Sequence, residues 1–331
     1  MDGQAQAEGG KYVVVWNEEM VRKSFDLFLK GRYEGDELGL VMLFARRKYD
    51  PNMESSEAML CRHAFNVQDA DADGFLRELR RFEVPLGTFT ERPKTNKPKK
   101  PIMTSKATVA YMTLNPKSTR LAWLEANQKL MTVLVKDPAQ ALRAFRSCRS
   151  TLDSSLHTAT SRRLFMDIDV DSKDLEVLLS VLQVLQQEKS MDSIVGGVET
   201  RGGYHIILQK SLMQKSAGRS IYSMSTDSGF SAENRTGDTI TKFDIELPKE
   251  PQIPIPGTVQ GGFRTLLLTR EDLGKILQEG GVPSAKETET GTGLDEIRAQ
   301  MAAEIGEEGE GEDGTRGGER DVVRVGRAVT H

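Results

Sequence analysis

Two aspartates inside an apolar stretch constrain this chain more than any other feature. The stretch reads Leu-Phe-Met-Asp-Ile-Asp-Val over residues 164–170 and predicts a buried strand. Because successive side chains of a strand point to opposite faces, Asp167 and Asp169 share one face. Two buried carboxylates side by side are costly, since desolvation and like charge both disfavour their ionised forms. A divalent cation removes that cost, and two oxygen ligands on one strand suit Mg²⁺ or Mn²⁺.

The alternative is a strand end whose acids face solvent, or a helix cap. Asp171 fits the description of a cap, because residues 172–189 predict a helix and acids favour its first turn. Asp167 and Asp169 lie before that cap and within the apolar run. Their position therefore favours a metal site over a solvent-facing pair.

A glycine turn follows in residues 198–208, which read Val-Glu-Thr-Arg-Gly-Gly-Tyr-His-Ile-Ile-Leu. The pattern predicts two short strands around the turn Arg201, Gly202 and Gly203. Paired glycines allow positive φ and a close approach of the backbone to a ligand. A histidine among apolar residues, such as His205, is more often a core residue than a ligand. Its place one residue after an arginine and two glycines instead favours phosphate binding.

Together the two motifs resemble those of the archaeo-eukaryotic primase superfamily, over roughly residues 107–270. That superfamily includes small primase subunits, primase-polymerases and bacterial repair polymerases. The resemblance implies that Asp167 and Asp169 belong to its hDhD strand, which holds two metal ions. It also implies that His205 contacts the phosphates of the incoming nucleotide, as in the family's S-x-H or G-R-G-x-H motif. Arg201 then matches the basic residue of that motif, and Gly203 stands where the S-x-H form has serine.

The family's third motif, a single hD on a later strand, has several candidates here. Residues 242–247, Lys-Phe-Asp-Ile-Glu-Leu, have this form on a predicted strand. Residues 253–262 follow with Ile-Pro-Ile-Pro-Gly-Thr-Val-Gln-Gly-Gly, which looks like the Pro-Gly-Ser/Thr turn found after the third motif in primases. Asp244 is the expected third metal ligand. The alternatives are acids nearby in the chain: Glu246, Glu250, Asp238 and Asp227. Asp244 alone, or Glu246 alone, is nearly as well explained as a residue on the solvent-exposed face of an edge strand.

Charge is unevenly distributed along the 331 residues. Residues 281–331 hold 12 of the 49 acids and 6 of the 45 Lys and Arg residues, which leaves 37 acids and 39 bases in the remainder. A near-neutral body of this kind is compatible with a basic groove. The Glu- and Gly-rich residues 281–331 predict a disordered acidic tail, and residues 1–10 a disordered N-terminus.

The interleaved helix and strand patterns predict an α+β fold in two parts. Residues 11–106 would form an N-terminal αβ layer that carries a basic Pro/Lys-rich loop at 88–106. Residues 107–280 would form a primase-like catalytic domain with an RRM-like sheet, as the resemblance implies. Lys117 and Arg120 occur at a predicted strand-to-helix junction, where anions tend to bind. Surface solubility is the favoured explanation for both.

The composition also bounds the environment of the protein. Two cysteines, Cys61 and Cys148, exclude a disulfide scaffold and a Cys-rich zinc site, and they fit a reducing compartment. No apolar run approaches the length of a membrane span, and the polar N-terminus resembles neither a signal peptide nor a transit peptide. We therefore expect an intracellular protein of nucleus or cytoplasm, without membrane association.

The resemblance implies a metal-dependent nucleotidyltransferase with Mg²⁺ or Mn²⁺ as cofactor. Its substrates would be nucleotide triphosphates and a single-stranded template, and its partners would be replication proteins. Two other classes stay open. A metal-dependent nuclease would use the same carboxylates with water, although a triphosphate-binding hairpin is superfluous there. A catalytically inactive, primase-like nucleic-acid-binding protein is compatible with the missing serine and the undecided third acid.

Overall fold

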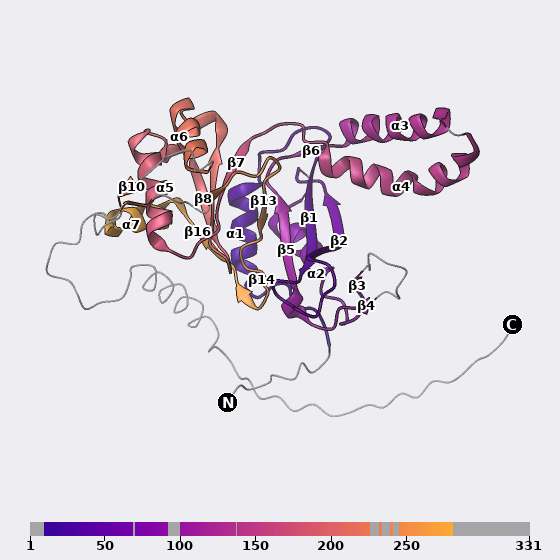
Figure 1. Ribbon diagram of the computed structural model, residues 1–331, viewed down its shortest axis with the longest axis horizontal. Coiled ribbons are helices and arrows are strands. Elements are labelled where there is room, and N and C mark those ends of the chain that lie inside the picture. The colour runs from indigo at the N-terminus through magenta and orange to yellow at the C-terminus, as the bar shows by residue number, and fades with distance from the viewer. Residues whose placement is uncertain are drawn as a thin grey trace, which may run out of the picture. The chain divides into compact units, whose positions relative to one another are not determined.

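The apolar residues around the two aspartates form an inner strand of one of two five-stranded antiparallel sheets in the computed structural model (Figure 1). The structure describes residues 10–68, 70–91, 100–136, 138–225, 232–233, 239–240 and 245–280. Over these residues the fold is mixed α+β, which confirms the predicted class. The expected termini, apart from Gly10, and residues 92–99 of the Pro/Lys-rich loop lie outside the described residues.

The described helices are α1 (Glu18–Phe28), α2 (Ala72–Arg80), α3 (Thr119–Lys136), α4 (Ala141–Thr158), α5 (Leu175–Gln187), α6 (Lys215–Ser225) and α7 (Arg270–Gly280). The strands of the first sheet are β1 (Glu37–Arg46), β2 (Glu57–Phe65), β5 (Thr108–Thr113), β6 (Lys117–Ser118) and β13 (Gln252–Pro254). Those of the second are β7 (Phe165–Val170), β8 (Ile194–Glu199), β9 (Tyr204–Gln209), β12 (Ile245–Glu246) and β16 (Leu266–Leu268). Three two-stranded ribbons pair β3 (Thr90–Glu91) with β4 (Lys100–Pro101), β10 (Ala232–Glu233) with β11 (Thr239–Ile240), and β14 (Val259–Gln260) with β15 (Phe263–Arg264).

The first sheet has the order β13-β5-β1-β2, and β6 pairs with the beginning of β1. Residues 107–280 thus supply three of its strands, so the sheet crosses the expected boundary between residues 106 and 107. Residues 58–66, whose pattern is ambiguous in sequence, are mostly within the edge strand β2. Residues 12–16, which predict a strand, instead make only an isolated bridge between Val15 and Thr258.

The second sheet has the order β12-β7-β9-β8-β16. Its first four strands in chain order follow the connection β7-α5-β8-β9-α6-β12, a split β-α-β arrangement in which each neighbouring pair is antiparallel. Figure 1 shows α5, α6 and α7 on the side of this sheet away from α1. The sheet therefore has one face covered by these helices and one face turned toward α1 and the first sheet.

Helix α1 joins the two sheets through one hydrophobic core. Asn17 caps the helix, and its side-chain oxygen accepts a hydrogen bond from the Met20 N–H at 2.8 Å. The buried face carries Phe25 and Phe28, which belong to the same core as residues of both sheets. Within the described ranges, no helix combines the length and apolarity needed to cross a bilayer.

Candidate functional site

A polar cavity of about 300 Å³ is lined by residues from both sheets. The second sheet and its turns contribute Asp167, Asp169, Asp171, Thr200, Gly202 and His205. The first sheet and its connections contribute Phe44, Arg46, Lys48, Glu57, Tyr111, Pro248, Glu250, Gln252 and Gln260. Residues from both predicted motifs, which are far apart in the chain, thus line one space.

The strand β7 gives the two aspartates a common face, as its alternation predicts. Asp167 is fully buried, whereas the side chain of Asp169 is 34% exposed. Burial, together with the nearby Asp167 and Asp171 carboxylates, raises the pKa of Asp169 to about 6. The surroundings of Asp169 therefore disfavour its ionised form, because several carboxylates lie close together at this site.

The register of the sheet brings further side chains beside the aspartates. Asp169 is directly opposite His205 on β9 and opposite Glu246 on β12. Cross-strand partners share a face, so the three side chains form one row across the sheet. Glu246, one of the alternative third acids, is therefore in register with Asp169, and its side chain is exposed.

His205 lies between the two aspartates in a buried position. Its Nδ1 is 3.0 Å from Oδ2 of Asp167, and its Nε2 is 3.7 Å from Oδ1 of Asp169. Burial alone would lower the pKa of His205, but the Asp167 and Asp169 carboxylates outweigh it and raise the pKa to about 9. His205 is therefore a buried cation at neutral pH, and it compensates part of the aspartate charge.

We expect His205 to titrate near pH 9 in the metal-free protein, against an ordinary value of 6.5. This pKa is higher in the folded than in the unfolded protein, so protonation of His205 stabilises the folded state. That stabilisation is complete below pH 6.5 and is lost as pH rises through about 9. A pH titration of the imidazole Cε1 protons by NMR, assigned with His205→Gln, measures it. His157, whose pKa is lowered by burial and nearby cations, is the internal comparison. A midpoint at or below 6.5 for His205 would contradict the described geometry.

The glycine turn is built differently from its prediction. Thr200 closes it, because its backbone N–H donates to the Gly203 carbonyl at 2.9 Å. Neither Gly202 nor Gly203 has positive φ. Instead, a Cβ on Gly203 would fall far inside contact distance of the Val170 carbonyl oxygen and 2.7 Å from the Ser172 N–H nitrogen. The close approach is thus to the chain's own backbone, and this explains why no serine stands at Gly203.

Arg201 holds a neighbouring turn. Its guanidinium donates to the Gly261 carbonyl at 2.8 Å and lies over the Tyr49 ring at 5.2 Å. Its backbone N–H donates to Oε1 of Gln260, whose amide in turn donates to the Tyr49 hydroxyl. Gly261 has φ of +59°, and a Cβ there would be 2.6 Å from the Tyr49 ring. One donor of the Arg201 guanidinium thus holds the turn at Gly261, and the predicted contact of this arginine with a phosphate stays a prediction.

The first sheet supplies a wall that the sequence motifs do not indicate. Arg46 pairs with Glu57 at 2.6 Å and lies over the Tyr111 ring at 5.2 Å. Phe44 meets Tyr111 edge to face, with centroids 5.6 Å apart. Burial raises the pKa of Tyr111, so its hydroxyl stays protonated. The one signal in the sequence is the cationic run Arg-Arg-Lys ending at Lys48, which directly follows a buried apolar strand.

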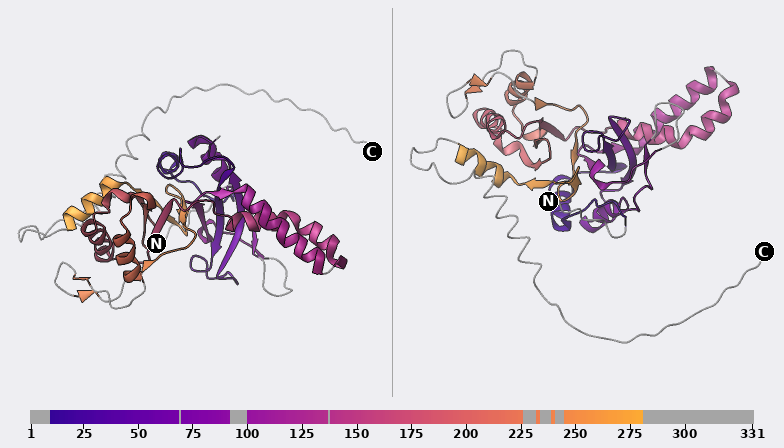
Figure 2. Two further views of the ribbon diagram at one scale, coloured as in Figure 1. Left: turned by 90° about the horizontal axis from the view of Figure 1, so that it is seen from above. Right: turned by 60° about the horizontal axis from the view of Figure 1, so that its bottom comes forward.

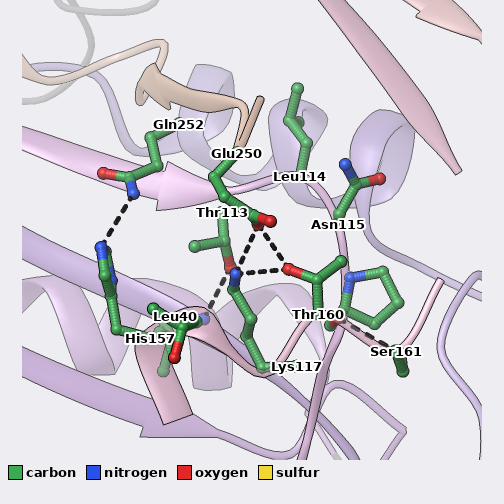
Figure 3. Close-up of polar contacts among 12 residues, drawn as sticks. Leu40, Thr113, Leu114, Asn115, Lys117, His157, Thr160, Ser161, Glu250 and Gln252 are labelled. Carbon is green, nitrogen blue, oxygen red and sulfur yellow. Dashed lines mark hydrogen bonds and ion pairs between the residues drawn. The ribbon is translucent and has the colours of Figure 1, made fainter. Parts of the chain in front are cut away.

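Glu250, another alternative third acid, forms an ion pair with Lys117 (Figure 3). The Lys117 ammonium donates to Oε2 of Glu250 at 2.8 Å and to the Thr160 hydroxyl at 2.7 Å. Thr160 donates in turn to Glu250. Lys117 is 1% exposed, so the structure corrects its expected place at the surface. The pair of Lys117 and Glu250 holds the segment before β13 against β6. Glu250 therefore lines the cavity as the partner of a buried lysine.

Of the three expected metal ligands, Asp167 and Asp169 belong to the described residues. Asp244, Asp238 and Asp227 lie outside the described residues. Within the part that the structure describes, no group of three or more His, Cys, Asp or Glu side chains is arranged to hold a metal ion. The hard oxygen donors and excess negative charge of Asp167 and Asp169 nevertheless fit Mg²⁺ or Mn²⁺.

One further position differs from its prediction. The cap of α5 is Asp174, whose side chain accepts from the Glu176 N–H. Asp171, predicted as that cap, instead lines the cavity, because α5 begins several residues later than the pattern indicates.

No protein-family profile, curated protein or solved structure matches this chain.

Proposed function

We propose that the protein is a metal-dependent nucleotidyltransferase that resembles primases and primase-polymerases. The observation that carries the proposal is the meeting of Asp167, Asp169 and His205 in one cavity. These residues come from two motifs whose joint occurrence is the basis of the resemblance. The proposed substrates are nucleotide triphosphates and a single-stranded template, and replication proteins are the proposed partners.

The topology supports the same proposal. The connection β7-α5-β8-β9-α6-β12 with strand order β12-β7-β9-β8 is compatible with the RRM-like sheet expected of primase relatives. The acid pair lies on an inner strand of this sheet, and the histidine lies on the strand beside it. The first sheet, which residues 11–106 and 107–280 build together, completes the cavity.

In this proposal Asp167 and Asp169 hold Mg²⁺ or Mn²⁺, with Glu246 or Asp244 as a third ligand. When bound, such ions lower the pKa of an attacking 3′-hydroxyl and stabilise the leaving pyrophosphate. The protonated His205 would donate to a phosphate oxygen of the incoming nucleotide.

The cavity walls would assist in binding the nucleotide. Arg46 and Lys48 add positive charge on the wall from the first sheet. Arg201 would keep the turn with Gly261 in place and so shape the edge of the cavity. Each of these roles can be tested separately by substituting the residue concerned.

A catalytically inactive, nucleic-acid-binding protein is the second candidate. It is favoured by one observation, namely that the described residues bring no third carboxylate into a metal-binding group with Asp167 and Asp169. The two candidates differ in whether the acid pair binds a divalent cation.

We expect the purified protein to bind Mn²⁺, followed as the loss of the free-ion signal in electron paramagnetic resonance. Asp169→Asn should weaken binding at least about tenfold, because removing a ligand costs no less than removing a residue that supports one. Asp192→Asn is the matched control, since that side chain is 84% exposed and pairs with Arg270. Equal Mn²⁺ binding by the Asp169 and Asp192 variants would contradict the proposed metal site.

A further inference from the structure

Helix α3 exposes far more apolar surface than a helix at the surface of a monomer normally does. Apolar residues occur on every side of it, yet only Ala122 and Ala126 are buried. A helix that is apolar all round is usually covered on all sides. Figures 1 and 2 show α3 and α4 packed side by side as a hairpin that extends away from both sheets. Most of α3 therefore has no cover within the described residues.

The exposed side of α3 has a regular seam. Five exposed residues recur at alternating spacings of three and four: Leu121, Leu124, Gln128, Met131 and Val135. This is the spacing of the a and d positions of a coiled coil, which places all five on one stripe. Ala122 and Ala126 lie on the other side of the helix, where α3 and α4 pack together. The seam is thus shaped to receive another helix.

The charges on α3 select the kind of partner. The seam itself carries no charged side chain, and Glu125 and Lys129 beside it pair with each other at 2.6 Å. A nucleic-acid site would need cations along the seam to meet phosphates. The basic residues Arg120, Lys129 and Lys136 of α3 are not part of the seam, and Arg143, Arg146 and Arg149 are on α4. A neutral, apolar stripe with one amide at its centre is complementary to a copy of itself.

The area fits a dimer of modest stability. Leu124 is 59% exposed and Val135 is 76% exposed. Two such seams together would cover roughly 1,000 Å², which is at the lower end of specific protein interfaces. The pairing should therefore depend on protein concentration.

We propose that the protein forms a homodimer in which α3 of one copy packs antiparallel against α3 of the other. The antiparallel direction follows from the hairpin, because parallel pairing would bring the two sheet-bearing bodies to the same end of the bundle. In this direction Leu124 of one copy faces Val135 of its partner, and Gln128 lies near the two-fold axis. A two-fold interface of this kind buries the same stripe on both copies.

Sedimentation equilibrium of the full chain tests the proposal. The mass should rise from that of one chain, 36.7 kDa, toward that of two as the concentration increases over about 1 to 100 µM, the range expected for an interface this small. Leu124→Lys combined with Met131→Lys should keep the protein monomeric throughout. Gln128→Glu, an exposed polar replacement that leaves the apolar packing of the monomer intact, should weaken dimerisation at least tenfold.

The matched control is Leu212→Lys, which changes a leucine of similar exposure, 52%, outside the hairpin. It should dimerise like the unchanged protein, and circular dichroism should show equal helix content in all variants. A monomer at every concentration would overturn the proposal. So would a dimer that survives both the double lysine variant and Gln128→Glu, because its interface would then be elsewhere.

Discussion

Replacing Asp167 by asparagine is expected to lower nucleotidyl transfer by at least about 100-fold, the scale on which removing one charged or hydrogen-bonding group from an active site acts. Asparagine keeps the shape of this fully buried side chain but removes its charge. Two properties are lost together, namely one proposed metal ligand and the carboxylate that keeps His205 protonated. The rate of labelled nucleotide incorporation measures the first loss, and the NMR midpoint of His205 should fall in the same variant.

Asp192→Asn should retain full activity, since Asp192 is a surface residue. Comparing the melting temperatures of both variants separates a catalytic effect from unfolding. An Asp167→Asn protein that is folded and fully active would show that the acid pair has no part in catalysis.

Gly203→Ala is expected to cost about 3 kcal/mol or more of the free energy of unfolding, as overpacking against a rigid neighbour does. The added methyl group would overlap the carbonyl oxygen of Val170, and the Ser172 backbone closes the other side. Because these atoms belong to the backbone of β7 and its continuation, no side-chain rotation relieves the overlap. Thermal unfolding should show a melting temperature lower by about 6 to 12 °C, the shift that such a loss gives in a domain of this size.

Gly274→Ala in α7 is the matched control. Apart from the nearby backbone of its own helix, no atom lies within 4 Å of a Cβ built there, so the same substitution should stabilise the helix by about 0.5–1 kcal/mol. If Gly203→Ala melted at the temperature of the unchanged protein, the close contact of the glycine turn with β7 would be wrong.

Local patterns were sufficient to predict the elements that carry the two motifs. The alternation around Asp167 and Asp169 defined a strand with both acids on one face, and the structure has it as β7. The glycine turn separates β8 from β9 as predicted. These features depend on neighbours in the chain, which is why sequence periodicity identifies them.

Features that depend on distant contacts were not predictable in the same way. Lys117 looks like a surface residue until β6 brings it to Glu250, 133 positions later in the chain. Arg46 joins the cavity because the first sheet lies beside the second. Arg201 donates to the Gly261 carbonyl, 60 positions later in the chain, a contact that its own neighbours in sequence do not indicate. In each case tertiary packing, rather than local sequence, decides which partner the charge meets.

The most direct test of the central claim is template-dependent nucleotide incorporation by the unchanged protein. The reaction would contain single-stranded DNA, labelled NTPs or dNTPs and Mg²⁺ or Mn²⁺, beside an Asp167→Asn/Asp169→Asn control. The account predicts labelled product with the unchanged protein and none with the control. Degradation of the template in place of product would indicate a nuclease. No product at all, from a folded protein that still binds single-stranded DNA, would contradict the proposed nucleotidyl transfer and favour the inactive binding protein.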